Sequence, residues 1–240
     1  MCGRFTISKT EQELEKRFGA NFYSKVLKAR YNVAPTQLSA VITHDEPEAV
    51  QLFRWGLVPF WAKDLGIGAR MINARSETVS EKPAFKDAYR KRRCLVLADG
   101  YYEWIKRGKE KIPHRIQIRD QAPFAMAGLW ERWKAKTPEA ETVHTFTIIT
   151  VPAAKSVVHI HDRMPAILHR DQERLWLDLD LPEKEAEQLL LPYPEDELQY
   201  YTVSKKVNST RNESEDLLEP FDYSEEEEPP AQPDLFSGLN

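Results

Sequence analysis

The chain carries a cysteine at position 2, directly after the initiating methionine. Cytosolic aminopeptidases remove Met1 efficiently before a small residue, so Cys2 can become the first residue. It then holds a free α-amine and a thiol on adjacent carbons. The α-amine has a pKa of about 7.7 to 8.0 and the thiol one of about 8.5, so both are expected to supply reactive forms near neutral pH without large shifts. Such a 1,2-aminothiol captures aldehydes, first as a Schiff base and then as a five-membered thiazolidine.

Three further segments place polar, chemically active side chains beside apolar runs, where a strand would deliver them to a loop. They are "INARSET" with Asn73, Arg75 and Glu77, "ADGYYEW" with Asp99 and Glu103, and "HIHDRMP" with His159, His161, Asp162 and Arg163. Histidine and glutamate are suited to proton transfer. Asparagine can hold an amine or a hydroxyl without titrating.

Each of these residues also has an ordinary structural interpretation. Glu103 can be the solvent-facing member of an alternating strand, and Asn73 can cap a turn. His161 can bind a backbone carbonyl. His159 lies two residues away, on the same face if the segment is extended, and competes for the same role.

The elements that must position these residues are mostly strands. The segments "LSAVITH" and "AVQLFRWGLV" flank the turn "DEPE", which predicts two strands and a turn. Further strands are predicted at "CLVLADGYYEWI", "HRIQIRD", "FAMAGLWERW", "TFTIITVP" and "MPAILH". Because most strands follow one another directly, antiparallel pairing is favoured over a parallel sheet. We expect an α+β fold, with a single domain over residues 1–212 built around a β core.

Helices are expected at four places. The segment "SKTEQELEKRFG" offers two overlapping capping boxes, Ser8 with Glu11 and Thr10 with Glu13, and ends at Gly19. The other three predicted helices are "EKPAFKDAYRKR", "RDQERLWLDL" and "PEKEAEQLLL".

The composition restricts the class of protein. No stretch approaches the ~18 uninterrupted apolar residues of a membrane helix, and the first residues turn polar at once, so we expect a cytoplasmic protein that does not bind membranes. The two cysteines, Cys2 and Cys94, exclude a disulfide framework, and Cys94 is expected to be a buried apolar residue. Scattered histidines and the lack of a glycine-rich phosphate loop indicate no metal and no cofactor.

The charge is distributed unevenly. Residues 213–240 hold ten acidic residues and no basic one, whereas residues 1–212 hold 34 basic and 28 acidic residues. We expect 213–240 to be a disordered acidic tail. Within it, "QPDLF" resembles the peptides that bind the bacterial sliding clamp, with Gln232, Leu235 and Phe236 as the contacts. The alternative is a solubilising tail in which these residues are incidental.

Taken in order, six motifs resemble the SOS-response-associated peptidase (SRAP) family, whose members form covalent adducts with abasic sites in single-stranded DNA. The motifs are "MCGRF", "RYNVAPTQ", "RWGLVPFWA", "MINARSET", "LADGYYEW" and "HDRMP", and they span residues 1 to about 210. The resemblance implies a β-barrel-like core flanked by helices and a positively charged groove that ends at the N-terminal cysteine.

The resemblance also implies a role for each matching residue. Cys2 would be the nucleophile, with Asn73, Glu103 and His161 around it, and Glu103 and His161 would divide the proton transfers. Arg4, Trp61 and Arg75 would contact DNA. The residues themselves indicate that Trp55 is the buried tryptophan of "RWGLVPFWA", and that Lys205 and Lys206 either extend the groove or remain solvated. The implied partner is single-stranded DNA with abasic sites, bound by a monomer that associates with the nucleoid during DNA damage.

Two other functions remain open at this point. A cysteine hydrolase would use the Cys2 thiol on a peptide bond with His161 as its base, and would tolerate a blocked amine. A non-enzymatic single-stranded DNA binder that recruits the clamp would not need Cys2. Lyase or self-cleaving peptidase activity could accompany crosslinking.

Overall fold

The computed structural model describes residues 2–23, 28–137 and 139–224, and its core is a closed barrel of five strands. Neighbours in the order β5-β4-β7-β10-β11 pair antiparallel, and a parallel pairing of β11 with β5 closes the ring at Thr145↔Arg54 and Phe146↔Trp55. The strands are β4 (Leu38–Thr43), β5 (Ala49–Trp55), β7 (Arg93–Ala98), β10 (Phe124–Lys134) and β11 (Thr142–Pro152). The predicted α+β class with a β-barrel-like core is therefore confirmed.

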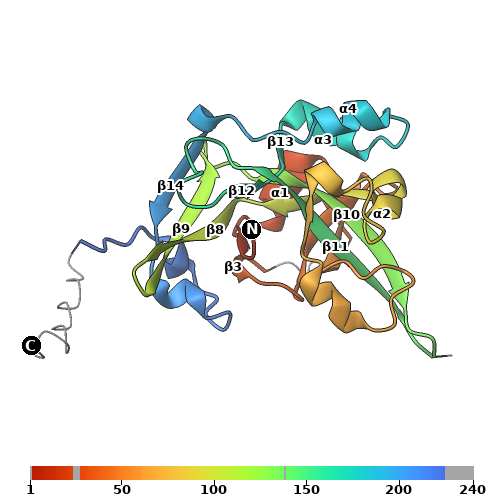
Figure 1. Ribbon diagram of the computed structural model, residues 1–240, viewed down its shortest axis with the longest axis horizontal. Helices are drawn as coiled ribbons and strands as arrows, with labels where there is room; N and C mark the ends of the chain where they lie inside the picture. Colours follow the sequence, from red (N-terminus) through yellow and green to blue (C-terminus); the bar gives the residue numbers. More distant parts are fainter. Residues whose placement is uncertain (1, 24–27, 138, 225–240) are drawn as a thin grey trace, which may run out of the picture.

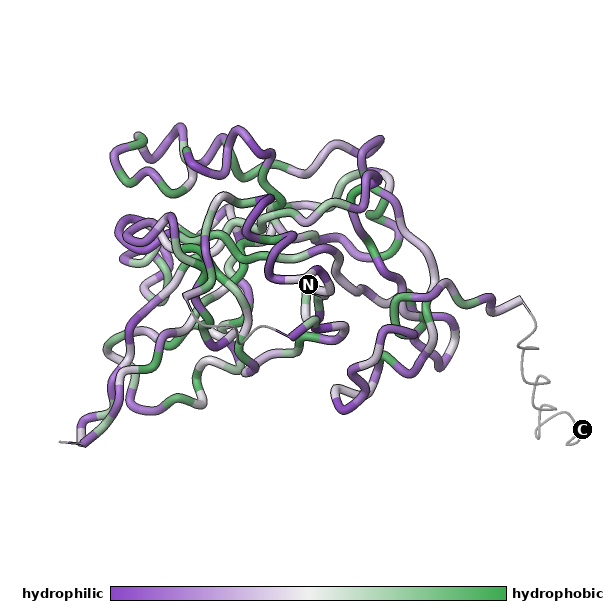
Figure 2. The backbone as a smooth tube through the Cα atoms, turned by 180° about the vertical axis from the view of Figure 1, so that it is seen from behind, coloured by the Kyte–Doolittle hydropathy of each residue, from purple (hydrophilic) through white to green (hydrophobic). Residues whose placement is uncertain are grey.

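Aromatic and branched apolar side chains fill the barrel. Trp55 stacks on Phe146 with ring centroids 6.4 Å apart, and Phe5 meets Trp55 edge-on at 5.0 Å. Every residue of β7 is buried, including Cys94, as the sequence predicts. Figure 2 shows hydrophobic segments running through the crossing strands, whereas the peripheral turns are mostly hydrophilic.

Short elements extend the barrel at its edges. Four short strands join its sheet: β2 (Asn21–Phe22), β6 (Asn73–Arg75), β12 (Arg163–Pro165) and β13 (Ile167–Leu168). The three predicted later helices are present in shortened form, as α2 (Lys86–Lys91), α3 (Arg170–Leu177) and α4 (Glu183–Gln188). Figure 1 shows α3 and α4 together at the top edge of the molecule. Within the described residues, no helix is long and apolar enough to cross a membrane.

A second sheet packs beside the barrel, with the strand order β14-β9-β8-β1-β3 (Figure 1). Its strands are β1 (Phe5–Ile7), β3 (Arg30–Val33), β8 (Gly100–Arg107), β9 (Glu110–Ile118) and β14 (Leu198–Thr202). The short β1 lies between β3 and β8, so the start of the chain is held inside a sheet rather than at its edge.

The segment "CLVLADGYYEWI" is two strands rather than the single one predicted. The chain leaves the barrel strand β7 at Asp99 and enters the second sheet as β8. Asp99 is buried, and its carboxylate accepts hydrogen bonds from the Ser8 hydroxyl at 2.8 Å and from Arg115 at 3.3 Å. A buried carboxylate needs such donors, and those available lie on β9 and just after β1, which fixes the break at this residue.

The first helix, α1 (Glu11–Phe18), follows the second of the two predicted capping boxes. The Thr10 hydroxyl accepts from the Glu13 amide, the Glu13 carboxylate accepts from the Thr10 amide, and Gly19 ends the helix with a φ of 63°. The first box is not the N-cap, because the helix begins at Glu11 and Ser8 lies two residues before the capping position, where its hydroxyl donates to Asp99.

The predicted start of the acidic tail at residue 213 is wrong, because the chain keeps contacts with the domain as far as Tyr223. The Glu213 carboxylate accepts from the Asn32 amide at 2.9 Å and from Arg30 at 3.0 Å. Leu217 in the 3₁₀ helix η5 (Glu215–Leu218) is fully buried, and the Tyr223 hydroxyl donates to the Val203 carbonyl at 2.7 Å. Four further 3₁₀ helices are η1 (Leu65–Arg70), η2 (Ser76–Thr78), η3 (Glu195–Glu197) and η4 (Lys205–Asn208).

The remaining part of the predicted tail, residues 225–240, lies outside the described residues. The candidate clamp-binding residues Gln232, Leu235 and Phe236 belong to this part.

Candidate active site

Cys2 lies three residues before β1 and is completely buried. Its Sγ atom is 3.9 Å from the carbonyl oxygen of Arg4. Burial, together with the negative charge of Glu103, raises the pKa of the Cys2 thiol well above its usual range. The expectation of a thiol that is partly ionised near neutral pH is therefore wrong for this structure, since removal from water disfavours the thiolate.

Asn73 binds the backbone of Cys2. It begins β6, which pairs in parallel with β11 at Ile148, and so extends the barrel sheet toward the start of the chain. The Asn73 Nδ2 atom donates to the Cys2 carbonyl oxygen at 2.8 Å. Its buried Oδ1 atom has no hydrogen-bond partner among the described residues. Asn73 thus holds Cys2 from a strand rather than capping a turn, and keeps one acceptor available.

Glu103 approaches Cys2 from β8. Phe5 pairs with Tyr101, and the Tyr102 amide donates to the Arg4 carbonyl at 2.9 Å. Continued by two residues, this antiparallel register places Glu103 level with Gly3, next to Cys2. Only 4% of Glu103 is exposed, so the solvent-facing interpretation is wrong.

The environment of Glu103 changes its acidity. Burial raises the pKa of the carboxyl above its ordinary 4.5, while the charge of His161 acts in the opposite direction. A carboxyl shifted in this direction can take up and release a proton closer to neutral pH.

His161 faces the same pocket as Glu103. This pocket, with a cavity volume of about 510 Å³, is lined by both residues. The His161 Nδ1 atom lies 3.0 Å from the Arg163 amide nitrogen and 2.9 Å from the Asp162 carboxylate, so this edge of the ring is held in place. Its sequence rival His159 is exposed and packs edge-on against Tyr200 at 5.1 Å. Of the two histidines, His161 is the one placed for chemistry at this pocket.

The loop that carries His161 is fixed by an ion pair. Arg163 binds the Glu77 carboxylate through both terminal nitrogens, at 2.5 and 2.9 Å, and donates to the Thr150 carbonyl at 2.6 Å. The hydrogen bonds from Arg163 lower the pKa of Glu77. Glu77 and Arg163 therefore join η2 to β12 and give this part of the site its shape.

The three residues expected to contact DNA differ in their availability. Arg75 is exposed, and Trp61 is 49% exposed beside the exposed Phe60, whereas Trp55 is buried, as predicted. Arg4 has internal partners: its Nη1 atom donates to the Asn32 side chain at 2.6 Å and to the Val207 carbonyl at 2.9 Å. DNA contact remains a prediction for all three.

Lys205 and Lys206, the two candidate lysines of the groove, have acidic partners. Lys205 pairs with Glu110 at 3.1 Å, and Lys206 pairs with Asp216 at 2.9 Å.

Sequence reasoning missed part of the pocket wall. Besides Glu103 and His161, the pocket is lined by Trp104, Lys106, Lys111 and Asn208. The Trp104 indole donates to the Asn208 side chain at 2.7 Å, which ties β8 to the end of η4. The lysines could have been found from "IKRGKEK", since a glycine turn between two short strands predicts cross-strand neighbours. Within the described residues, no group of three or more metal-ligating side chains forms.

Comparison with known proteins identifies similar sequences and structures. A sequence model described as SOS response associated peptidase (SRAP) matches residues 1–210. The abasic site processing protein YoaM of Bacillus subtilis is 42% identical over 224 residues, which cover 91% of this chain and 98% of YoaM. The abasic site processing protein YedK of Escherichia coli is 31% identical and covers 92% of this chain and 100% of its own length. A crystal structure of a protein from Bacteroides thetaiotaomicron superposes with a TM-score of 0.79 at 32% identity, over 85% of this chain and 93% of that one.

Two adjacent tyrosines of β8 allow the energetics of this region to be tested. Tyr101 and Tyr102 are both fully buried, but only the Tyr102 hydroxyl has a partner among the described residues, the Tyr31 carbonyl at 2.9 Å. A buried polar group without a partner costs about 1–3 kcal/mol. We expect Tyr101→Phe to leave the free energy of unfolding unchanged or to raise it by about 1 kcal/mol, and Tyr102→Phe to lower it by about 1–3 kcal/mol. Chemical denaturation of both variants checks this, and equal destabilisation by both contradicts it.

Proposed function

The chain belongs to the SOS response associated peptidase family, and we propose that it processes abasic sites in single-stranded DNA by forming a covalent thiazolidine through Cys2. The observation that supports this most directly is the placement of Cys2. Asn73 holds its carbonyl at 2.8 Å, Glu103 lies beside it on β8, and His161 faces the same pocket as Glu103.

The first step uses the amine. After Met1 is removed, the Cys2 nitrogen attacks C1 of the open-chain aldehyde that an abasic deoxyribose forms. The aldehyde forms from the cyclic hemiacetal when the bond from C1 to the ring oxygen breaks: His161, as an imidazolium, donates a proton to the ring oxygen and then takes up the proton that the C1 hydroxyl loses, so the ring of His161 is unchanged. The carbinolamine then loses its hydroxyl as water, which leaves with the proton that the α-ammonium group gave up before the attack, and a protonated C=N bond remains.

The second step uses the thiol. The Cys2 sulfur attacks the same carbon, the S–C1 bond forms, and the electron pair of the C=N bond returns to nitrogen. Because burial keeps the thiol protonated, its proton must pass to a nearby base in this step. Glu103 is adjacent and has a pKa raised toward neutrality by burial, so it accepts this proton.

Asn73 positions the nucleophile. Its amide nitrogen fixes the Cys2 carbonyl, and its unpartnered Oδ1 atom accepts a hydrogen bond from the α-amine once that amine is the chain terminus. Orientation of this kind contributes a large part of the rate of a bimolecular reaction.

Two exposed side chains support DNA as the partner. The exposed Trp61 offers a stacking face to an unpaired base, and the exposed Arg75 offers bidentate contacts to a phosphate. A single strand delivers the aldehyde to a buried residue without the cost of opening a duplex. We place this activity in a cytoplasmic monomer that joins the nucleoid when DNA is damaged.

A peptidase activity is the second candidate, because the family description names one. It would use the Cys2 thiol on a peptide bond, with His161 as its base, and could include release of Met1 by the chain itself. The amine separates the two candidates, since a thiol hydrolase tolerates a blocked amino terminus and a Schiff base cannot form from one. A non-enzymatic binder differs from both in needing no Cys2.

We expect the protein to form a heat-stable adduct with a single-stranded oligonucleotide that carries one abasic site. The adduct mass should equal protein plus DNA minus one water, as measured by intact mass spectrometry and a denaturing gel. Cys2→Ala, Cys2→Ser and a form with extra residues before Cys2 should give no heat-stable adduct. Equal crosslinking by the extended form or by Cys2→Ala would rule out the aminothiol mechanism.

The pH dependence of crosslinking should report Glu103. Two groups must lose a proton before reaction, the α-amine and Glu103, so at acidic pH the logarithm of the rate should fall with a slope approaching two. Since burial raises the pKa of the Glu103 carboxyl, the decrease in rate caused by protonation of Glu103 should begin above pH 4.5.

Glu103→Gln should slow crosslinking by about 10²-fold or more and reduce the limiting slope to one. Glu173→Gln is the matched control, because Glu173 is also a buried glutamate with a raised pKa but lies on α3 and pairs with Arg17. An unchanged slope in Glu103→Gln would exclude it as the base.

The "QPDLF" peptide is proposed to bind the sliding clamp through Gln232, Leu235 and Phe236 and to tether the domain to replicating DNA. The double change Leu235→Ala and Phe236→Ala should abolish clamp binding in a pull-down or by surface plasmon resonance, while crosslinking continues at the original rate. Undiminished clamp binding by the double variant, or none by the intact chain, would contradict this role.

A further inference from the structure

Two lysines face each other across the hairpin formed by β8 and β9. Lys106 pairs with Lys111 in the strand register, and both side chains are exposed. Like charges directly opposite each other destabilise an antiparallel pair. Stability of the hairpin therefore does not explain this arrangement.

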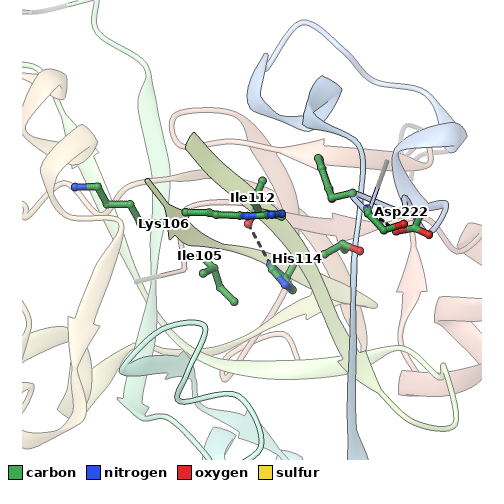
Figure 3. Close-up of a pocket in the computed structure, with 9 residues that line it drawn as sticks. Ile105, Lys106, Ile112, His114 and Asp222 are labelled. Carbon is green, nitrogen blue, oxygen red and sulfur yellow. Dashed lines mark hydrogen bonds between the residues drawn. The ribbon is translucent and has the colours of Figure 1, made fainter. Parts of the chain in front are cut away.

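Nearby acidic groups do not offset the charge. Within the described residues, neither lysine forms an ion pair, and the closest acidic residue of the hairpin, Glu110, pairs with Lys205 instead. Lys106 also lines a second pocket of about 450 Å³, together with Asp222, but Figure 3 shows the two at opposite sides of that pocket with Ile112 and His114 between them. The two ammonium groups thus form an uncompensated positive pair.

The position of this pair points to its ligand. Lys106 and Lys111 line the same pocket as Glu103 and His161. Lys106 follows Glu103 by three residues on β8, a span of roughly 10 Å at about 3.3 Å per residue. A polyanion bound in this pocket therefore meets a wall that carries both lysines.

We propose that Lys106 and Lys111 form a phosphate-binding pair that holds the backbone of the DNA strand flanking the abasic nucleotide. The inference rests on the proposed function for the identity of the strand. Ammonium groups bind phosphates as point charges without reading the base, which suits a protein that must accept an abasic site in any sequence.

Salt dependence provides a direct test, because each phosphate neutralised on a single strand adds about 0.7 to the slope of log K against log salt. Binding of a single strand that carries a tetrahydrofuran abasic analogue would be measured over a range of NaCl concentrations. The full-length Cys2→Ala chain would be used so that no adduct forms. We expect the added pair Lys106→Gln and Lys111→Gln to reduce the slope by about 1.4.

Matched variants separate this pair from net charge and from folding. Lys86→Gln with Lys184→Gln removes the same charge from exposed lysines on α2 and α4 and should leave the slope unchanged. Lys106→Arg with Lys111→Arg should retain the slope, because the charges remain. The glutamine pair should also unfold at a temperature equal to or above that of the parent, since it removes a repulsive pair.

An unchanged slope in the glutamine pair, or an equal loss in the control pair on α2 and α4, would overturn the proposal. In the chain with intact Cys2, the glutamine pair should require more DNA to reach half of its own maximal crosslinking rate. Failure of the original chain to crosslink would refute the proposed chemistry, whereas the salt slopes would still decide whether the lysines bind phosphate. The two failures are therefore distinguishable.

Discussion

The geometry of the site depends on a fixed position for Cys2, close to the start of the chain. Terminal residues usually fray because little packs against them, and Cys2 precedes the first strand. Here the hydrogen bond from Asn73 to the Cys2 carbonyl, at 2.8 Å, supplies the constraint that a strand partner would otherwise give. It acts together with β1, which is only three residues long but is paired on both sides, by β3 and by β8. Without either restraint, a buried thiol at this position would have no fixed relation to Glu103.

The two sheets each position one of the residues beside Cys2. The barrel carries Asn73 through β6, and the second sheet carries Glu103 through β8, so the distance between the two residues is set by how the sheets join. Asp99 makes that junction, because it accepts hydrogen bonds from Ser8 after β1 and from Arg115 on β9. A side chain with no contact to the pocket thus controls its geometry, since buried charges require their partners in one arrangement.

The sequence predicted the features that depend on neighbours in the chain. The capping box of Thr10 and Glu13, the end of α1 at Gly19 and the β4–β5 hairpin follow from local patterns. Closure of the barrel joins Arg54 to Thr145 across a long stretch of chain, which no local pattern encodes. The burial of Glu103 was missed for the same reason. Alternation predicts one covered and one solvent-facing side of β8, but Tyr101, Tyr102 and Glu103 are all buried, so both faces are covered at this end of the strand. The folded segment after Glu213 was also missed, because its acidic composition concealed single contacts such as Glu213 with Asn32.

Burial of the site also bears on the order of steps in the proposed mechanism. A cysteine with an ordinary pKa would offer thiolate and amine together, and either could attack the aldehyde first. In this structure burial disfavours the thiolate, and a neighbouring carboxylate disfavours it further. In the proposed mechanism the amine is therefore the group that reacts first, and the thiol would react only when a positively charged C=N bond is present and Glu103 can take its proton. In that mechanism, burial makes the free thiol unreactive, and the Cys2 sulfur would attack only after the bond between the amine and the aldehyde carbon has formed.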